Sequence, residues 1–96
     1  MSCYCIFDFL TVSDAAKWED YKKRVRPVVE KFGGRYLAAG GKFEVVEGSW
    51  RPVLPVILQF PSLQKAHEWY DSADYRELKA QRLAATQSNA VFLEGF

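Results

Sequence analysis

The spacing of apolar residues changes along the chain, and each change predicts a new element of secondary structure. Residues 3–11 are a short, aromatic and β-branched run with apolar positions on both faces, which predicts a strand. After Ser13 or Asp14, either a good N-cap, apolar residues recur every three or four positions and predict a helix that ends at Gly33-Gly34. We expect Pro27 to kink or shorten this helix, because proline lacks a backbone N–H group.

The middle of the chain predicts two further strands joined by an arm. A strand is expected at 35–39, and Gly40-Gly41 interrupts it before an extended alternation resumes at 43–47. This pattern is typical of a bulged or bent arm. A third strand is predicted at 53–60, with Pro55 at an edge or near the start because proline cannot donate to a ladder.

The last third of the chain predicts a helical crossover and a fourth strand. Ser62 is placed to cap a short helix through Asp71, and Ser72 is placed to cap a second helix that ends near Thr86. Residues 89–94 predict the final strand. The order β-α-β-β-α-β corresponds to an α+β, ferredoxin-like arrangement with a four-stranded antiparallel sheet.

This arrangement predicts a homodimer. The helices can cover only one face of the sheet, whereas the strands are apolar on both faces. The 96 residues are expected to form one domain over residues 1–96. A domain this small buries only a limited share of its surface unless a partner subunit covers more of it. A second copy, related by a two-fold axis, would cover the remaining apolar face.

Composition and charge argue against several classes of partner. The formal net charge is +1 and the charges are spread along the chain, so a nucleic-acid partner is not expected. Apolar runs end at about eight residues, short of the roughly 20 that span a bilayer, so we expect a cytoplasmic protein without a membrane partner. The chain has no glycine-rich phosphate loop, dinucleotide fingerprint or serine nucleophile elbow, and no cofactor is expected.

Two charged side chains fall on apolar faces. Arg82 follows the stripe of Tyr75 and Leu78 on the last predicted helix, so it faces inward and requires an anion or polar partner. It is either a structural ion pair or snorkelling side chain, or a ligand for a carboxylate or enolate in a cleft between helix and sheet. Asp8 is either paired with Arg82 or Arg35, or held in an apolar pocket where a raised pKa would suit a general base.

Few residues are suited to metal or redox chemistry. His67 is the only histidine, and without a second ligand at metal-binding spacing it is expected at the margin of its helix. Cys3 and Cys5 share a strand face at the edge of disulfide reach. We expect them to be buried thiols, and we expect no metal site.

Polar-tipped aromatic residues gather around the central turn and the crossover. They either pack in the core, which is the default for such residues, or line a ligand cavity. These residues are Trp50, Trp69, Tyr70 and Tyr75. Glu44 and Glu47 alternate with apolar residues and are expected on the exposed side of the arm.

A series of short motifs also runs through the chain in a fixed order. The motifs are Gly33-Gly34-Arg35, Gly40-Gly41, Glu44-Val45-Val46-Glu47-Gly48-x-Trp50, Phe60-Pro61-Ser62, Trp69-Tyr70-x-Ser72-x-x-Tyr75, Arg82 and Glu94-Gly95. This series resembles the domain-of-unknown-function 1330 family. Members look like dimeric α/β-barrel proteins, whose relatives include cofactor-free monooxygenases, isomerases, polyketide cyclases and haem-dependent enzymes.

The resemblance implies a fold, a homodimer and a small-molecule cleft between sheet and helices, but no reaction type. Gln59 stands where glutamate is common in the family, which counts against acid–base catalysis at that position. The family's charged or polar residues that are present here are Arg35, Glu44, Tyr70, Tyr75 and Arg82.

Two functions remain as hypotheses. In the first, the dimer binds a small anionic or carbonyl-bearing organic molecule, with Arg82 and Arg35 as charge partners and the aromatic residues as walls. As an enzyme it would need no cofactor, and an arginine would stabilise an oxyanion while Glu44 or Asp8 moves a proton. In the second, it is a non-catalytic ligand carrier or interaction module whose buried charges are paired structurally. Haem binding through His67 is a third, less favoured interpretation.

Overall fold

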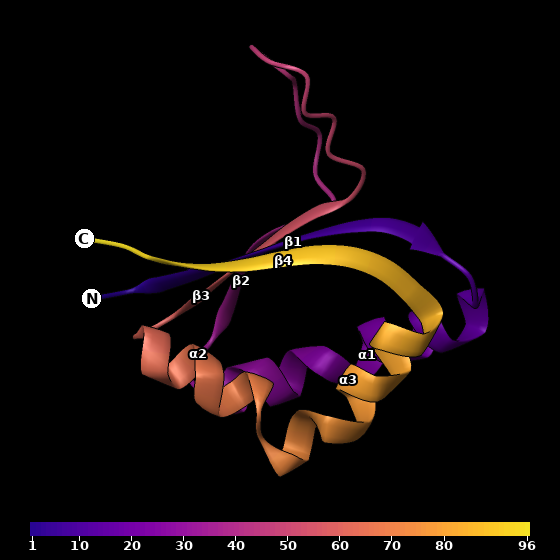
Figure 1. Ribbon diagram of the computed structural model, residues 1–96. Coiled ribbons are helices and arrows are strands. Elements are labelled where there is room, and N and C mark those ends of the chain that lie inside the picture. The colour runs from indigo at the N-terminus through magenta and orange to yellow at the C-terminus, as the bar shows by residue number, and fades with distance from the viewer.

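The computed structural model describes residues 1–96 and arranges the elements in the predicted order (Figure 1). The strands are β1 (Cys3–Val12), β2 (Arg35–Ala39), β3 (Pro55–Phe60) and β4 (Thr86–Glu94), and the helices are α1 (Ala15–Lys31), α2 (Leu63–Tyr70) and α3 (Ala73–Ala85). The strands form one antiparallel sheet in the order β2-β3-β1-β4. The predicted α+β, ferredoxin-like fold class is confirmed.

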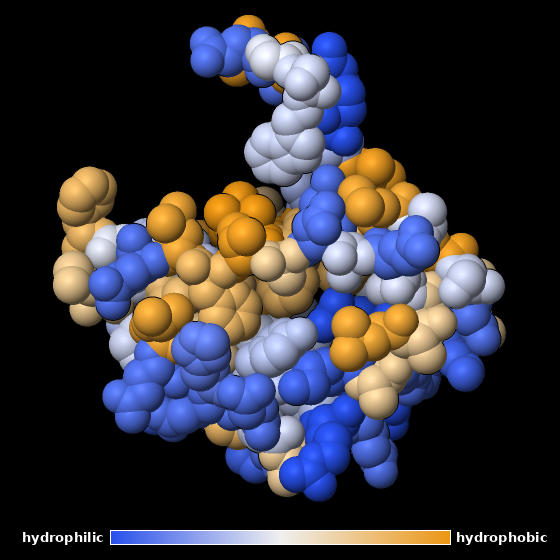
Figure 2. Space-filling view, viewed as in Figure 1, coloured by the Kyte–Doolittle hydropathy of each residue, from blue (hydrophilic) through white to orange (hydrophobic).

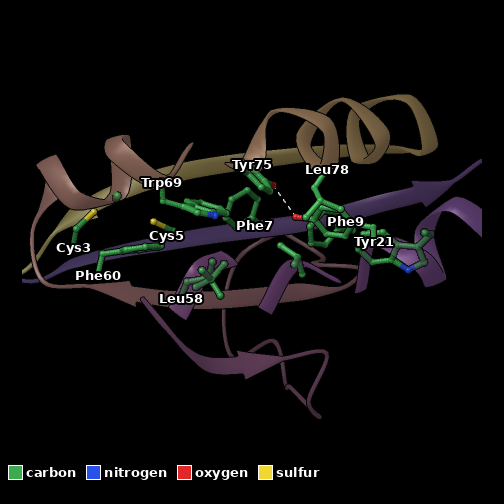
Figure 3. Packing of buried hydrophobic residues seen from close by; sticks show 14 residues of the cluster. Cys3, Cys5, Phe7, Phe9, Tyr21, Leu58, Phe60, Trp69, Tyr75 and Leu78 are labelled. Atoms are coloured by element: carbon green, nitrogen blue, oxygen red, sulfur yellow. Dashed lines mark hydrogen bonds between the residues drawn. The ribbon is translucent and has the colours of Figure 1, made fainter. Parts of the chain in front are cut away.

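All three helices lie on one face of the sheet, and no helix covers the other, which we call the open face (Figure 1). Because side chains alternate along a strand, Phe7 and Phe9 of β1 are buried beneath the helices, whereas Tyr4 and Ile6 point to the open face. Figure 3 shows the buried side chains between β1, β3 and the helices. The core therefore occupies only one side of the sheet.

Helix α1 supplies one wall of this core. The carboxylate of Asp14 caps its start by accepting a hydrogen bond from the backbone N–H of Lys17 at 3.1 Å. The helix continues through Pro27 to Lys31, so the prediction that proline shortens it is wrong. One missing hydrogen bond is outweighed by the burial of side chains on both sides of the proline. The buried residues are Trp18, Tyr21, Val25 and Val29.

Two glycines turn the chain from α1 into β2, as predicted. Gly33 has a φ of +83°, in the left-handed region that favours glycine at a helix end. Gly34 is needed for space, because a Cβ there would lie 2.6 Å from the ring of Phe60 and 2.7 Å from the side chain of Val29. The turn thus brings β2 directly beside the core.

An arm of residues 41–54 leaves the sheet between β2 and β3 and projects beyond the open face (Figure 1). The predicted extended segment at 43–47 is present as an unpaired stretch and not as a strand, and β3 begins at Pro55, two residues later than predicted. The carboxylate of Asp8 anchors the end of the arm that leads into β3. Its Oδ1 accepts hydrogen bonds from the backbone N–H groups of Val53 and Leu54, each at 2.9 Å.

The crossover between β3 and β4 contains two helices, as predicted. The hydroxyls of Ser62 and Ser72 accept hydrogen bonds from the backbone N–H groups of Lys65 and Tyr75, each at 3.1 Å, and so cap α2 and α3. Strand β4 begins at Thr86, earlier than the predicted 89, because it pairs along most of β1. None of the three helices combines the length and apolar character that a membrane crossing requires.

Candidate functional site

Arg82 lies inside the protein, on the face of α3 that packs against the sheet. Only 1 % of the residue is exposed, so the predicted inward orientation is confirmed. None of the six ion pairs in the chain includes it. A buried cation without a carboxylate is costly unless other groups solvate it. The ion-pair explanation of Arg82 therefore does not describe this structure.

Neutral groups surround the guanidinium. Nε donates to the hydroxyl of Tyr75 at 3.2 Å, one terminal nitrogen donates to Oγ of Ser88 at 3.1 Å, and the other lies 3.5 Å from the hydroxyl of Tyr70. The guanidinium carbon also lies 5.4 Å from the ring centre of Phe7, where the aromatic face attracts a cation. The positive charge is thus solvated but not neutralised.

A chain of hydroxyl groups extends from Arg82. The hydroxyls of Tyr75 and Tyr21 are 2.7 Å apart, as the dashed line in Figure 3 shows. Arginine can only donate, so the oxygen of Tyr75 accepts from Arg82, and either of the two tyrosine hydroxyls can donate to the other. The hydroxyl of Tyr75 thus links Arg82 to Tyr21.

Both tyrosines keep their protons at neutral pH. Burial raises the pKa of Tyr21, and the neighbouring Tyr75 raises it further. Burial also raises the pKa of Tyr75, although the charge of Arg82 opposes the shift. Both hydroxyls therefore remain neutral beside the positive charge of Arg82.

A cleft with a volume of about 410 Å³ opens between α1 and the helix-covered face of the sheet. Tyr21 lines it, and Lys22 and Arg26 are the two cations of the lining, which contains no carboxylate. The other lining residues are Phe7, Phe9, Trp18, Val25, Tyr36, Ala39, Gly40, Leu54, Val56, Leu58 and Trp69. The cleft is mostly apolar with a positive bias.

Trp69 also lines this cleft. It is 1 % exposed, and its ring packs against those of Phe60 and Tyr75, with centres 5.2 Å and 4.4 Å away. Its indole N–H is buried without a hydrogen-bond partner. Such orphan donors are rare in native proteins and call for an acceptor. Figure 3 shows the indole between α2 and the sheet, beside Phe7.

The predicted aromatic cluster is divided in the structure. Trp69, Tyr70 and Tyr75 lie together, with the ring centres of Tyr70 and Tyr75 6.0 Å apart. Trp50 lies on the arm with 67 % of its surface exposed and, together with Glu44, borders a different groove of about 400 Å³. The predicted ligand-binding residues thus occupy at least two separate places.

Arg35 and Asp8 are not brought to Arg82. Arg35 pairs across the sheet with Gln59, whose Oε1 accepts from its Nε at 3.0 Å and from a terminal nitrogen at 2.8 Å. Asp8 has no arginine partner, because both of its hydrogen bonds come from the backbone of the arm. Neither residue lines the cleft.

Tyr21 is the residue of the site that sequence reasoning missed. It belongs to the apolar spacing of α1, which by itself indicates only core packing, and the structure adds the contact with Tyr75, 54 positions away. The only available signal was its polar tip on an otherwise apolar stripe, since a buried tyrosine hydroxyl usually finds a partner.

The remaining reactive residues lie outside the cleft. His67 is exposed, with its ring centre 5.2 Å from that of Phe92, and no group of three potential metal ligands occurs. Cys3 and Cys5 are free and buried. Burial raises the pKa of the Cys5 thiol to about 12, so this sulfur is protonated and unreactive at neutral pH.

Solved structures with the same fold are similar to this chain along its whole length. RPA0582, a protein of unknown function from Rhodopseudomonas palustris, has a TM-score of 0.76 and 20% identity, covering 99% of this chain and 82% of that one. SnoaB, a cofactor-independent oxygenase from Streptomyces nogalater, has a TM-score of 0.59 and 8% identity, covering 99% and 91%. A dimeric ferredoxin-like protein of unknown function from Thermobifida fusca has a TM-score of 0.59 and 12% identity, covering 99% and 92%.

These identities are low enough that the similarity shows the fold alone. No curated protein matches the chain. The family model named Domain of unknown function (DUF1330), in contrast, matches residues 2–96, which is nearly the whole sequence. The chain belongs to the DUF1330 family.

Proposed function

We propose that this protein binds a small, mostly apolar organic molecule that carries a carbonyl or an anionic oxygen. The observation that carries this proposal is the buried, unpartnered indole N–H of Trp69, a residue that lines the same cleft as Tyr21. The site therefore offers hydrogen-bond donors and lacks a charged acceptor. An oxygen acceptor on the ligand would satisfy the indole, which an apolar ligand cannot do.

The charge distribution favours an anionic oxygen in particular. Arg82 is a buried cation linked through Tyr75 to Tyr21, and Lys22 and Arg26 add two further positive charges to the cleft lining. Fixed donors and positive charge in an apolar surrounding stabilise negative charge on oxygen more strongly than water-exposed groups do. A carboxylate, a phenolate or an enolate fits this pattern.

The catalytic form of the proposal is a reaction that needs no cofactor and passes through an oxyanion. Tyr21 and Trp69 would stabilise that oxyanion by hydrogen bonding. Asp8 and Glu44 lie outside the cleft, so neither is placed to take a proton from a ligand there. The similarity in fold to a cofactor-independent oxygenase supports this form, and the lack of a carboxylate base supports the alternative, a non-catalytic carrier.

We also propose that the protein forms a homodimer through the open face. The face carries exposed apolar residues, including Val91 and Leu93 of β4 at 57 % and 59 % exposure. The protein of the same fold from Thermobifida fusca is described as dimeric. A symmetric pair would cover this surface on both copies at once.

Ligand binding can be tested through intrinsic fluorescence, since Trp18 and Trp69 both line the cleft. The probes are aromatic carboxylic acids, the corresponding ketones and hydrocarbons of the same shape. We expect the acids and ketones to bind about tenfold more tightly than the hydrocarbons, as one charge-assisted hydrogen bond would produce.

Two variants and one matched control identify the site. Trp69→Phe removes the indole donor and Tyr21→Phe removes the hydroxyl, and each is expected to reduce the preference for the acid over the hydrocarbon. Tyr4→Phe removes a hydroxyl on the open face and should leave that preference unchanged. Equal binding of acid and hydrocarbon to the unmodified protein, or an unchanged preference in both variants, would falsify the proposal.

A further inference from the structure

Two cations lie over aromatic rings at the solvent-exposed side of the cleft. Nζ of Lys22 lies 5.6 Å from the ring centre of Trp18. The guanidinium carbon of Arg26 lies 5.7 Å from the ring centre of Tyr36. All four residues line the cleft, and the two cationic side chains are 47 % and 67 % exposed. A ligand group at this side of the cleft would therefore lie next to two positive charges.

Both cations come from α1, about one helical turn apart. Residues four positions apart lie on the same face of a helix, with their Cβ atoms about 5–6 Å from each other. A carboxylate has two acceptor oxygens, so one such group can accept hydrogen bonds from an ammonium and a guanidinium together. Lys22 and Arg26 thus form a subsite suited to a carboxylate.

The present partners of these cations are weak competitors for them. Lys22 pairs with Glu19 at 2.9 Å, and the glutamate side chain is 61 % exposed. Arg26 pairs with Glu30 at 3.6 Å, and that side chain is 55 % exposed. Exposed ion pairs contribute little, because water and salt screen them. Neither glutamate lines the cleft, so a ligand carboxylate against the apolar wall would be less screened than either of them.

Charge alone does not distinguish Lys22 and Arg26 from other residues of the helical layer. Figure 2 shows hydrophilic residues over much of α2 and α3, on the same side of the sheet. Lys23 and Arg24 are exposed cations on α1 itself, and neither lines the cleft. The distinguishing feature of Lys22 and Arg26 is their position over the aromatic wall of the cleft.

Trp69 forms the buried end of the cleft. Only 1 % of this residue is exposed, and its ring centre lies 6.3 Å from that of Phe7. Trp18, whose ring lies beneath Lys22, packs instead on Phe9, with ring centres 4.7 Å apart. Phe7 and Phe9 follow each other on one face of β1, with ring centres 5.9 Å apart (Figure 3). Trp69 and Lys22 therefore lie toward different ends of the lining, one buried and one exposed.

We propose that the ligand is an aromatic keto acid whose carboxylate lies between Lys22 and Arg26 and whose carbonyl lies at the buried end, beside Trp69. This inference rests on the proposed function and adds the class of the ligand and its orientation. Six of the 14 lining residues are aromatic, which favours a planar ring between the two oxygen groups. The volume of about 410 Å³ is within the range of small-molecule pockets.

Calorimetric titration with a matched pair of probes tests the carboxylate subsite. Both probes are naphthalenes with an acetyl group at one end, and the other end carries either a carboxylate or a carboxamide. They share their shape and their ketone and differ in charge. We expect the keto acid to bind about fivefold more tightly than the keto amide at low salt, because it forms two partly exposed ion pairs. This advantage should shrink as salt is added.

A double variant and a matched control identify the residues responsible. Lys22→Met with Arg26→Met is expected to abolish the advantage of the keto acid, and each single variant should leave an advantage of about twofold. The control, Lys23→Met with Arg24→Met, removes the same two charges from the same helix outside the cleft and should keep the full advantage. Circular dichroism checks folding, which we expect to persist because all four side chains are exposed.

The failures of the two proposals are distinct. Equal binding of keto acid and keto amide to the unmodified protein overturns the carboxylate subsite, as does an unchanged advantage in the variant that lacks Lys22 and Arg26. The contact at Trp69 is judged separately, by replacing the acetyl group with an ethyl group. An ethyl probe that binds as tightly as the acetyl probe overturns that contact and leaves the carboxylate subsite standing. Absence of binding by every probe at about 1 mM, where even weak specific complexes form, overturns both.

Discussion

The Nε atom of Arg82 lies 3.2 Å from the hydroxyl of Tyr75, and no carboxylate shares this buried cation. Removing one partner of a buried ion pair leaves an uncompensated charge, which costs about 3–5 kcal/mol. Here the partners are neutral hydroxyls that keep other hydrogen-bonding options. An ion pair and a set of neutral hydroxyl partners therefore predict different losses of stability when Arg82 is substituted.

Arg82→Met is expected to change the free energy of unfolding by no more than about 2 kcal/mol, because no opposite charge is orphaned and a desolvated cation is removed. Urea denaturation monitored by circular dichroism measures this value. The same variant should lose the preference for acidic ligands in the cleft. A loss of stability well above this range would show instead that Arg82 is chiefly a structural residue.

Tyr75→Phe and Tyr21→Phe are expected to differ in stability. The first removes the acceptor of the buried Nε of Arg82 and leaves a charged donor unsatisfied, at a cost of about 2 kcal/mol. The second leaves the contact between Tyr75 and Arg82 intact and should cost about 1 kcal/mol or less. Denaturation of the two variants side by side measures the order, and the reverse order would contradict the role of the Tyr75 hydroxyl as the acceptor for the buried Nε of Arg82.

Asp8 is expected to act through the arm. Asp8→Ala removes the acceptor of two backbone N–H groups, those of Val53 and Leu54, and should destabilise the protein by about 2–4 kcal/mol. Asp8→Asn keeps a side-chain oxygen and serves as the matched control, with a loss of about 1 kcal/mol. Equal losses in both variants would mean that the charge of Asp8, and not its hydrogen bonds, matters.

Stability is expected to fall in alkaline solution. Burial raises the pKa of Tyr36 from 10.0 to about 12 and that of Cys5 from 9.0 to about 12. Above the unfolded-state values the unfolded chain binds fewer protons than the native chain, so the free energy of unfolding decreases as pH rises. The contribution of these groups is complete below about pH 9 and is lost progressively toward about pH 12.

Urea denaturation at a series of pH values, with tyrosinate absorbance recorded in parallel, measures this decline. Tyr36→Phe removes one of the groups and should make the decline less steep. Burial raises the pKa values of Tyr21 and Tyr75 as well, so part of the decline should remain in this variant. A constant free energy of unfolding from about pH 8 to about pH 11 would contradict the burial of these hydroxyls.

Gln59→Glu tests the contact with Arg35 on the open face. The amide oxygen of Gln59 accepts two hydrogen bonds from the guanidinium, and both side chains are partly exposed to solvent. A carboxylate in its place should stabilise the protein by no more than about 1 kcal/mol, because exposed pairs are weak and screened by salt. Thermal denaturation at low and high salt measures the effect, which should diminish as salt is added.

Local patterns were sufficient to predict most of the fold. Helix α1 follows from its apolar spacing and from Gly33-Gly34 at its end, and the caps at Ser62 and Ser72 follow from residue type alone. The inward orientation of Arg82 also follows from spacing, because position on a helix stripe determines which way a side chain points. The length of α1 beyond Pro27 did not follow, since packing on both sides of the proline outweighs one missing hydrogen bond.

The candidate site followed from the sequence only in part. The sequence by itself determined the element order, the apolar open face and the burial of Arg82, because each depends on periodicity within one element. Only the tertiary structure decided that Arg82 meets Tyr75 and Ser88 and no carboxylate, and that Tyr75 meets Tyr21. It also decided that Trp69 has no partner and that Trp50 lies elsewhere. Contacts between elements far apart in the chain depend on how those elements pack, and no local pattern encodes that packing.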